Sequence, residues 1–83
     1  MTNEKTLVLR NLIIRDYSNL QNELQKRNEV LFNDFVELQY QKENYDFDVC
    51  LNLLNRLDDF LVNDLNHSQS SIKEKILNYI EKF

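Results

Sequence analysis

The chain has 83 residues, of which 42% are hydrophobic and 29% charged, and its formal net charge is −4. A chain of this length is expected to form a single domain, residues 1–83, around one small core. It contains no glycine and no proline, although average usage is about 7% and 5%. Glycine-dependent hairpins, phosphate-binding loops and calcium loops are therefore excluded. The twelve asparagines are left to form turns and helix caps.

Hydropathy and charge limit the class of partner. Apolar residues never run for more than three positions, so we expect neither a transmembrane helix nor a signal-peptide core. A single cysteine is typical of a cytosolic protein. Residues 28–67 carry nine acidic and two basic groups, whereas residues 1–27 are net +2 and residues 68–83 net +1. Nucleic acid requires a positive face and is not expected as a partner.

The first helix is predicted over about residues 3–27. Its apolar residues recur at steps of three and four and therefore share one face: Leu9, Ile13, Tyr17, Leu20 and Leu24. Asn28 follows two cations and is predicted to end this helix and cap the next one. The alternative is an unbroken helix over residues 9–43, roughly 52 Å long, that forms a dimeric coiled coil. A compact domain favours the break and a monomer.

Helices are also predicted over about residues 29–43 and 47–66. The first of these buries Leu31, Phe35 and Leu38, and Tyr45 either joins them or lies partly exposed at the following turn. The second has the clearest apolar stripe in the chain: Cys50, Leu53, Leu54, Leu57, Phe60, Leu61 and Leu65. Asp46 is predicted as its N-cap, with Asp48 in the first turn where the helix dipole favours an anion.

The last helix is predicted over residues 71–83. Ser71 and Glu74 have the spacing of a capping box. The apolar stripe of this helix is Ile72, Ile76, Tyr79, Ile80 and Phe83. Four amphipathic helices with short connections predict an all-α protein, an antiparallel four-helix bundle.

The residue pattern predicts no catalytic, cofactor-binding or metal site. His67 is the single histidine, has no second ligand at metal-binding spacing, and falls in a predicted turn. Cys50 lies on an apolar stripe, where a free cysteine behaves as a small hydrophobic residue. The carboxylates are interpreted as helix caps and solvated helix faces, because an acid–base pair requires a desolvated member in a cleft.

Two groups of residues are instead candidates for binding a protein partner. Aromatic side chains near the predicted turn between the second and third helices are expected to be partly exposed, and exposed aromatic residues are frequent interface anchors. Acidic side chains on the third helix form a partner-binding patch or, for Asp58 and Asp64, ion pairs with Arg10, Arg15 or Lys26. With the aromatic residue that ends the predicted last helix, the candidates are Tyr40, Tyr45, Phe47, Asp58, Asp59, Asp64 and Phe83.

One stretch resembles a known family. The segment EVLFNDFVELQYQKENYDFD, followed by CLNLLNRLDDFL, is similar to the pediocin-like (class IIa) bacteriocin immunity proteins of the enterocin A immunity type. The shared features are an aliphatic-aromatic helix, an acidic turn and a leucine-rich helix, and SSIKEKILNYIEKF matches their fourth helix loosely. The resemblance covers about residues 29–83 and is best over residues 29–61.

The resemblance implies an antiparallel four-helix bundle without catalysis that acts on the cytosolic side of the membrane in a producer cell. Such proteins engage the membrane receptor, a mannose phosphotransferase permease, once bacteriocin has bound it. In the family, the C-terminal half, including a tail packed after the fourth helix, carries specificity, whereas here Phe83 falls on the fourth helix itself. The alternative hypothesis is a small helical inhibitor or regulator of a cytosolic enzyme, of the phage-protein or antitoxin type.

Overall fold

The computed structural model describes residues 4–40, 45–65 and 71–83. These residues form four helical segments, and no strand occurs among them. The first segment comprises α1 (Glu4–Tyr17), a 3-10 turn (Ser18–Leu20) and α2 (Gln21–Arg27). The others are α3 (Glu29–Tyr40), then α4 (Phe47–Asp59) with a π-helical turn (Phe60–Asp64), and α5 (Ile72–Lys82). The predicted all-α class is confirmed.

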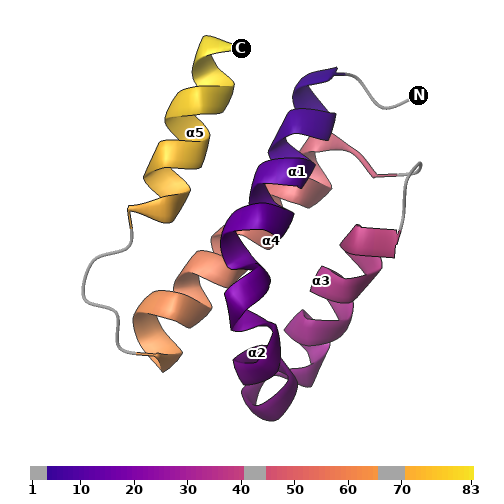
Figure 1. Ribbon diagram of the computed structural model, residues 1–83, viewed down its shortest axis with the longest axis vertical. Coiled ribbons are helices and arrows are strands. Elements are labelled where there is room, and N and C mark those ends of the chain that lie inside the picture. The colour runs from indigo at the N-terminus through magenta and orange to yellow at the C-terminus, as the bar shows by residue number, and fades with distance from the viewer. Residues whose placement is uncertain (1–3, 41–44, 66–70) are drawn as a thin grey trace.

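The segments form an antiparallel four-helix bundle built around α1 and α4. Segments that follow one another along the chain run in opposite directions, so α1 and α4 run the same way (Figure 1). Both α1 and α4 contact α3 and α5, and they also contact each other. As Figure 1 shows, α3 and α5 lie on opposite sides of this central pair. The bundle has a radius of gyration of 12.3 Å and extents of 34 × 25 × 17 Å.

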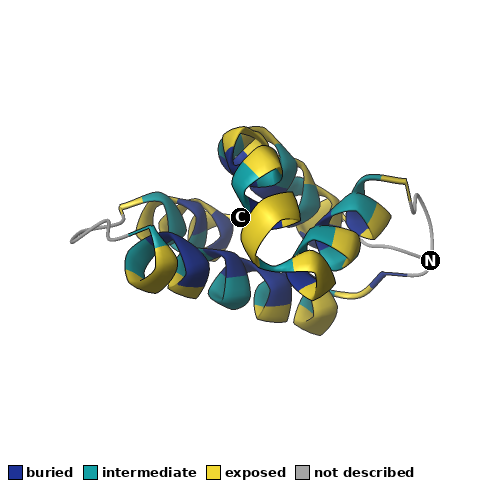
Figure 2. Ribbon diagram, turned by 90° about the horizontal axis from the view of Figure 1, so that it is seen from below, coloured by how far each residue is buried: buried dark blue, intermediate teal, exposed yellow. Residues whose placement is uncertain are grey.

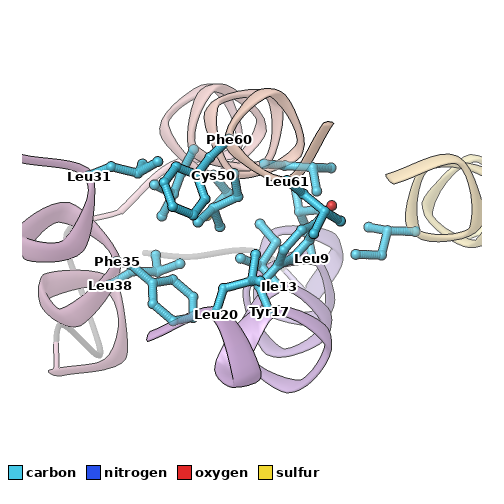
Figure 3. Packing of buried hydrophobic residues seen from close by; sticks show 14 of the residues in the cluster. Leu9, Ile13, Tyr17, Leu20, Leu31, Phe35, Leu38, Cys50, Phe60 and Leu61 are labelled. Atoms are coloured by element: carbon cyan, nitrogen blue, oxygen red, sulfur yellow. The ribbon is translucent and has the colours of Figure 1, made fainter. Parts of the chain in front are cut away.

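The predicted apolar stripes of the first three segments make one continuous core. Figure 2 shows the buried residues turned to the inside of the bundle and the exposed ones to its outside. In Figure 3, Ile13, Phe35 and Leu61, from the first three segments, converge on the same interior. Of the predicted stripe residues here, Leu65 alone is only partly buried, at the end of the π-helical turn.

Asn28 separates α2 from α3, as predicted. Its backbone leaves the helical region (φ −147°, ψ 83°), and its N–H donates to the carbonyl of Leu24 at 2.8 Å. Its side-chain Oδ1 accepts from the N–H of Leu31 at 3.1 Å, which satisfies a donor at the start of α3. One residue therefore closes one helix and caps the next. The alternative of an unbroken coiled-coil helix is wrong.

Two turns depart from the regular α-helices that the periodicity predicts. The 3-10 turn begins at Ser18, whose hydroxyl donates to the carbonyl of Arg15 at 3.2 Å, a local bond that competes with regular helix. The π-helical turn is closed by the Leu65 N–H, which donates to the Phe60 carbonyl at 3.2 Å. The 3-10 turn joins α1 to α2 within the first segment, and the π-helical turn ends the third segment.

The start and the apolar stripe of α5 differ from prediction. Ser71 already has helical backbone angles (φ −91°, ψ −5°), and its side chain makes no cap hydrogen bond, so the predicted capping box is wrong. A capping side chain reaches the free N–H groups from an extended backbone, which Ser71 lacks. Ile76 and Ile80 are buried, but Tyr79 and Phe83 are 55% and 51% exposed. The fourth segment, α5, therefore packs against the bundle through an apolar stripe that is narrower than predicted.

In the ranges that the structure describes, no helix combines the length and apolar character needed to cross a membrane.

Candidate functional site

The three aromatic candidates near the α3–α4 connection lie in different environments. Tyr40, the last residue of α3, is 79% exposed. Phe47, the first residue of α4, is half-buried against the core, with Lys5 Nζ at 5.4 Å from its ring centroid. Tyr45 is only 5% exposed and belongs to the core. Its predicted exposure is therefore wrong, and Tyr40 is the open aromatic residue of the group.

Arg10 of α1 explains why Tyr45 is buried. Its guanidinium carbon lies 5.4 Å from the centroid of the Tyr45 ring. The same group donates from Nε to the carbonyl of Leu38 at 3.0 Å and from Nη2 to the carbonyl of Gln39 at 2.9 Å. These carbonyls belong to the last turn of α3, where a cation also complements the helix dipole. Arg10 thus joins the end of α3 to the start of α4.

The acidic candidates on the third segment do not form one patch. Asp59 and Asp64 are exposed and line a shallow hollow of about 240 Å³ at the end of α4. Asp58 is half-buried, and its Oδ1 has no hydrogen-bond partner among the described residues. The Asp64 carbonyl, and not its carboxylate, accepts from Arg27 Nη1 at 3.1 Å.

The ion pairs predicted for these carboxylates do not form. Arg15 pairs instead with its sequence neighbour Asp16, with Nε 2.8 Å from Oδ1, and this contact raises the pKa of Arg15. Arg10 bonds to backbone carbonyls, and Lys26 is exposed at the end of α2. The prediction is wrong because a helix C-terminus offers unsatisfied carbonyls that compete for a nearby cation.

An opening that combines apolar and charged side chains lies between α3 and α4, near the predicted turn. It is a groove of about 440 Å³, within the range of ligand-binding clefts. Its apolar part comprises Leu38, Tyr45, Val49 and Leu53, of which Val49 is 54% exposed. Its polar part comprises Asp34, Glu37, Asp46, Asp48, Asn52 and Arg56. We call this opening the acidic groove.

The start of α4 holds one end of the acidic groove in place. Asp46 has an extended backbone (φ −115°, ψ 175°), and its Oδ1 accepts from the N–H of Val49 at 2.8 Å. The predicted N-cap is therefore confirmed. Asp48 lies in the first turn of α4, as predicted, and its side chain is exposed. Capping fixes the direction of α4 and so presents both Asp48 and Val49 to the groove.

Four carboxylates and one guanidinium line the acidic groove. Arg56 Nη1 meets Asp34 Oδ2 at 2.7 Å, an ion pair that joins α4 to α3 across the groove. For Asp48, the described ranges contain no cation within ion-pair distance. Arg56 also lines the hollow that contains Asp59 and Asp64, so the two openings adjoin at this residue. The groove therefore presents excess negative charge around an apolar centre.

A second opening lies between α1 and α5 on the other side of the central pair. It has a volume of about 540 Å³ and an apolar part made by Leu12, Ile72, Ile76 and Tyr79. Its charged residues are Arg15, Asp16 and Lys75, of which the first two pair with each other. We call it the α1–α5 hollow. Sequence analysis missed it because three of its residues, Ile72, Ile76 and Tyr79, are ordinary members of the apolar stripe predicted for the last helix.

The described residues offer little for nucleophilic or metal chemistry. Burial raises the pKa of the Cys50 thiol from 9.0 to about 11; the charge of Arg10 opposes this increase and that of Asp46 adds to it. A thiol with so high a pKa carries almost no thiolate at neutral pH. Over residues 4–40, 45–65 and 71–83, no three His, Cys, Asp or Glu side chains are grouped to hold a metal ion. His67 lies outside the described residues.

Comparison with known proteins finds no family model, no curated sequence and no solved structure that matches the chain. The function is therefore inferred from the chemistry of the acidic groove and from the sequence.

Proposed function

We propose that this chain is a non-catalytic protein-binding domain of the cytosol and that the acidic groove is its binding surface. The observation that carries the proposal is the half-exposed Val49, which lies in a groove between the carboxylates of α3 and α4 with the buried Leu38, Tyr45 and Leu53. Exposed apolar surface rimmed by polar groups is characteristic of interaction sites. The high pKa of Cys50 argues against that thiol as a nucleophile.

The biological role that we propose is bacteriocin immunity, by engagement of the bacteriocin-bound mannose phosphotransferase permease. Support comes from the resemblance of residues 29–61 to the pediocin-like immunity proteins. These residues include both helices that form the acidic groove. Such a role places the protein at the cytosolic side of the membrane without insertion, acting as a monomer.

Expression of the chain in a bacteriocin-sensitive strain tests this role. The wild-type protein should raise the tolerated bacteriocin concentration, and the double variant Asp48→Asn/Val49→Ser should lose most of that protection. The matched control is Glu74→Gln/Val30→Ser. It removes one charge from the first turn of α5 and one exposed valine from α3, both outside the acidic groove. If the folded wild-type protein gives no protection, the immunity role is wrong.

The alternative role is inhibition or regulation of a cytosolic enzyme, as by a phage protein or an antitoxin. The exposed carboxylates Asp59 and Asp64 in the hollow at the end of α4 favour this role where the target has a basic active-site entrance. The genes beside the coding sequence distinguish the two. A bacteriocin precursor gene supports immunity, whereas phage or toxin genes support the alternative.

A further inference from the structure

We propose that the acidic groove binds one cationic amphipathic α-helix of a protein partner, with an apolar stripe against Val49 and with Lys or Arg residues on both sides of that stripe. This inference deepens the proposed binding function and relies on it. It does not depend on the immunity role.

The shape of the groove fits a helix. Its sides are two antiparallel helices, α3 and α4 (Figure 1), and its apolar lining comes from both of them and from Tyr45 before α4. Amphipathic helices bind grooves of this kind through apolar residues that repeat every three or four positions. On α4 the groove is lined from Asp48 to Arg56, which is about 12 Å at 1.5 Å per residue. A partner helix of about 14 residues, roughly 21 Å long, would span that length.

The charge of the groove determines the chemistry of the partner. Carboxylates stand on both sides, from α3 at Asp34 and Glu37 and from α4 at Asp48. The single guanidinium, Arg56, is already paired with Asp34. Of the basic residues of α1, Arg10 bonds to carbonyls at the end of α3 and Lys5 lies over the Phe47 ring, and neither lines the groove. With four carboxylates and one guanidinium the lining has a net negative charge, which a cationic partner complements.

The same charge disfavours other macromolecular partners. The cytosolic membrane surface and nucleic acids are both anionic, and the carboxylates of the groove would repel them. A second copy of this chain would have to offer a cationic helix face, and the cations of the α1–α5 hollow are Lys75 and an arginine that is paired with Asp16. A cationic helix from another protein fits best.

A synthetic peptide tests the inference directly. The probe has about 14 residues, with leucine at helical stripe positions and lysine at the flanking ones. Fluorescence anisotropy would measure its binding to the full chain at low and at physiological salt. We expect binding that weakens as salt increases, because exposed charges are screened. A scrambled peptide of the same composition and a version with glutamate in place of lysine should bind at least tenfold more weakly.

Two pairs of variants locate the binding site. Asp48→Asn should weaken binding severalfold, whereas Glu74→Gln, which also removes an acidic charge from a first helical turn, should not. Val49→Ser should likewise weaken it more than Val30→Ser, since both valines are exposed on helices and only Val49 lines the groove. Circular dichroism would confirm that all four variants fold.

Several results would overturn the inference. Equal binding of the scrambled peptide, or equal weakening by Asp48→Asn and Glu74→Gln, would show unspecific attraction to net negative charge. Binding of an alkylamine without binding of the peptide would assign the groove to a small molecule. Self-association that Asp48→Asn abolishes would assign it to a second copy. If the peptide binds but the protection assay fails, the inference stands and the immunity role does not.

Discussion

The acidic groove and the α1–α5 hollow have similar volumes, about 440 and 540 Å³, but opposite charge. Both have an apolar part formed by side chains of two antiparallel helices. Four carboxylates and one guanidinium line the first, whereas two cations and one carboxylate line the second. Charge, and not size, therefore distinguishes the two surfaces.

The difference originates in the arginines of α1. Arg10 faces the α3–α4 side, where it bonds to backbone carbonyls at the end of α3. Arg15 faces the α1–α5 side, where it pairs with its neighbour Asp16. One arginine therefore maintains a tertiary contact, and the other makes a local contact on the surface.

The largest expected difference in stability is between variants that remove one or the other of these arginines. Arg10→Ala removes two charge-assisted hydrogen bonds and the contact with Tyr45, and should lower the free energy of unfolding by about 2–4 kcal/mol. Arg15→Ala should leave it unchanged within experimental error, because an exposed ion pair contributes little. Urea unfolding followed by circular dichroism measures both. Equal losses of unfolding free energy in the two variants would show that Arg10 and Arg15 do not differ in their contribution to the fold.

Alkaline pH should lower the free energy of unfolding through the buried Cys50. The pKa of Cys50 is about 11 in the folded protein and 9.0 when the thiol is exposed, so between these values the unfolded chain releases a proton that the folded chain retains. Stability therefore falls as pH rises from 9 to 11, by at most about 2.7 kcal/mol, and is unaffected by this group below pH 9. The stability difference between wild type and Cys50→Ala should narrow over that range. A constant difference would contradict the expectation.

A smaller difference in stability is expected between variants at the starts of α4 and α5, the helices that begin beside the two openings. Asp46→Ala removes the cap of α4 and should cost about 1 kcal/mol. Ser71→Ala, at the equivalent position before α5, should change stability by a few tenths of a kcal/mol at most, because the Ser71 side chain makes no cap hydrogen bond. Thermal unfolding of both variants measures the difference. A cost for Ser71→Ala as large as that for Asp46→Ala would restore the predicted capping box.

Helix positions and core residues could be predicted because they depend on local spacing. Apolar stripes assigned Ile13, Phe35 and Leu54 to the core, and the preferences of Asn28 and Asp46 for capping located two helix starts. The capping box at Ser71 was wrong, because spacing does not determine the backbone angles that a cap requires. The 3-10 and π-helical turns were not predicted either, since packing and local hydrogen bonds create them.

The candidate site was harder to predict than the fold. Tyr40, Asp59 and Asp64 are exposed, as the sequence suggested, but Tyr45 is buried beneath Arg10. Val49, the exposed apolar residue of the acidic groove, gave no signal as a site, because valine near a helix start is unremarkable in sequence. A groove is formed by two helices, and only their relative position shows which side chains line it.

The sequence by itself determined the helical class, the break at Asn28 and the apolar faces, because these follow from periodicity, capping and the absence of glycine and proline. The tertiary structure alone decided which charges meet. Arg10 bonds to carbonyls of α3 that are 28 and 29 residues away, and Arg56 pairs with Asp34 across 22 residues. Partners so distant in sequence are chosen by the packing of whole helices, and that choice leaves one side of the molecule acidic.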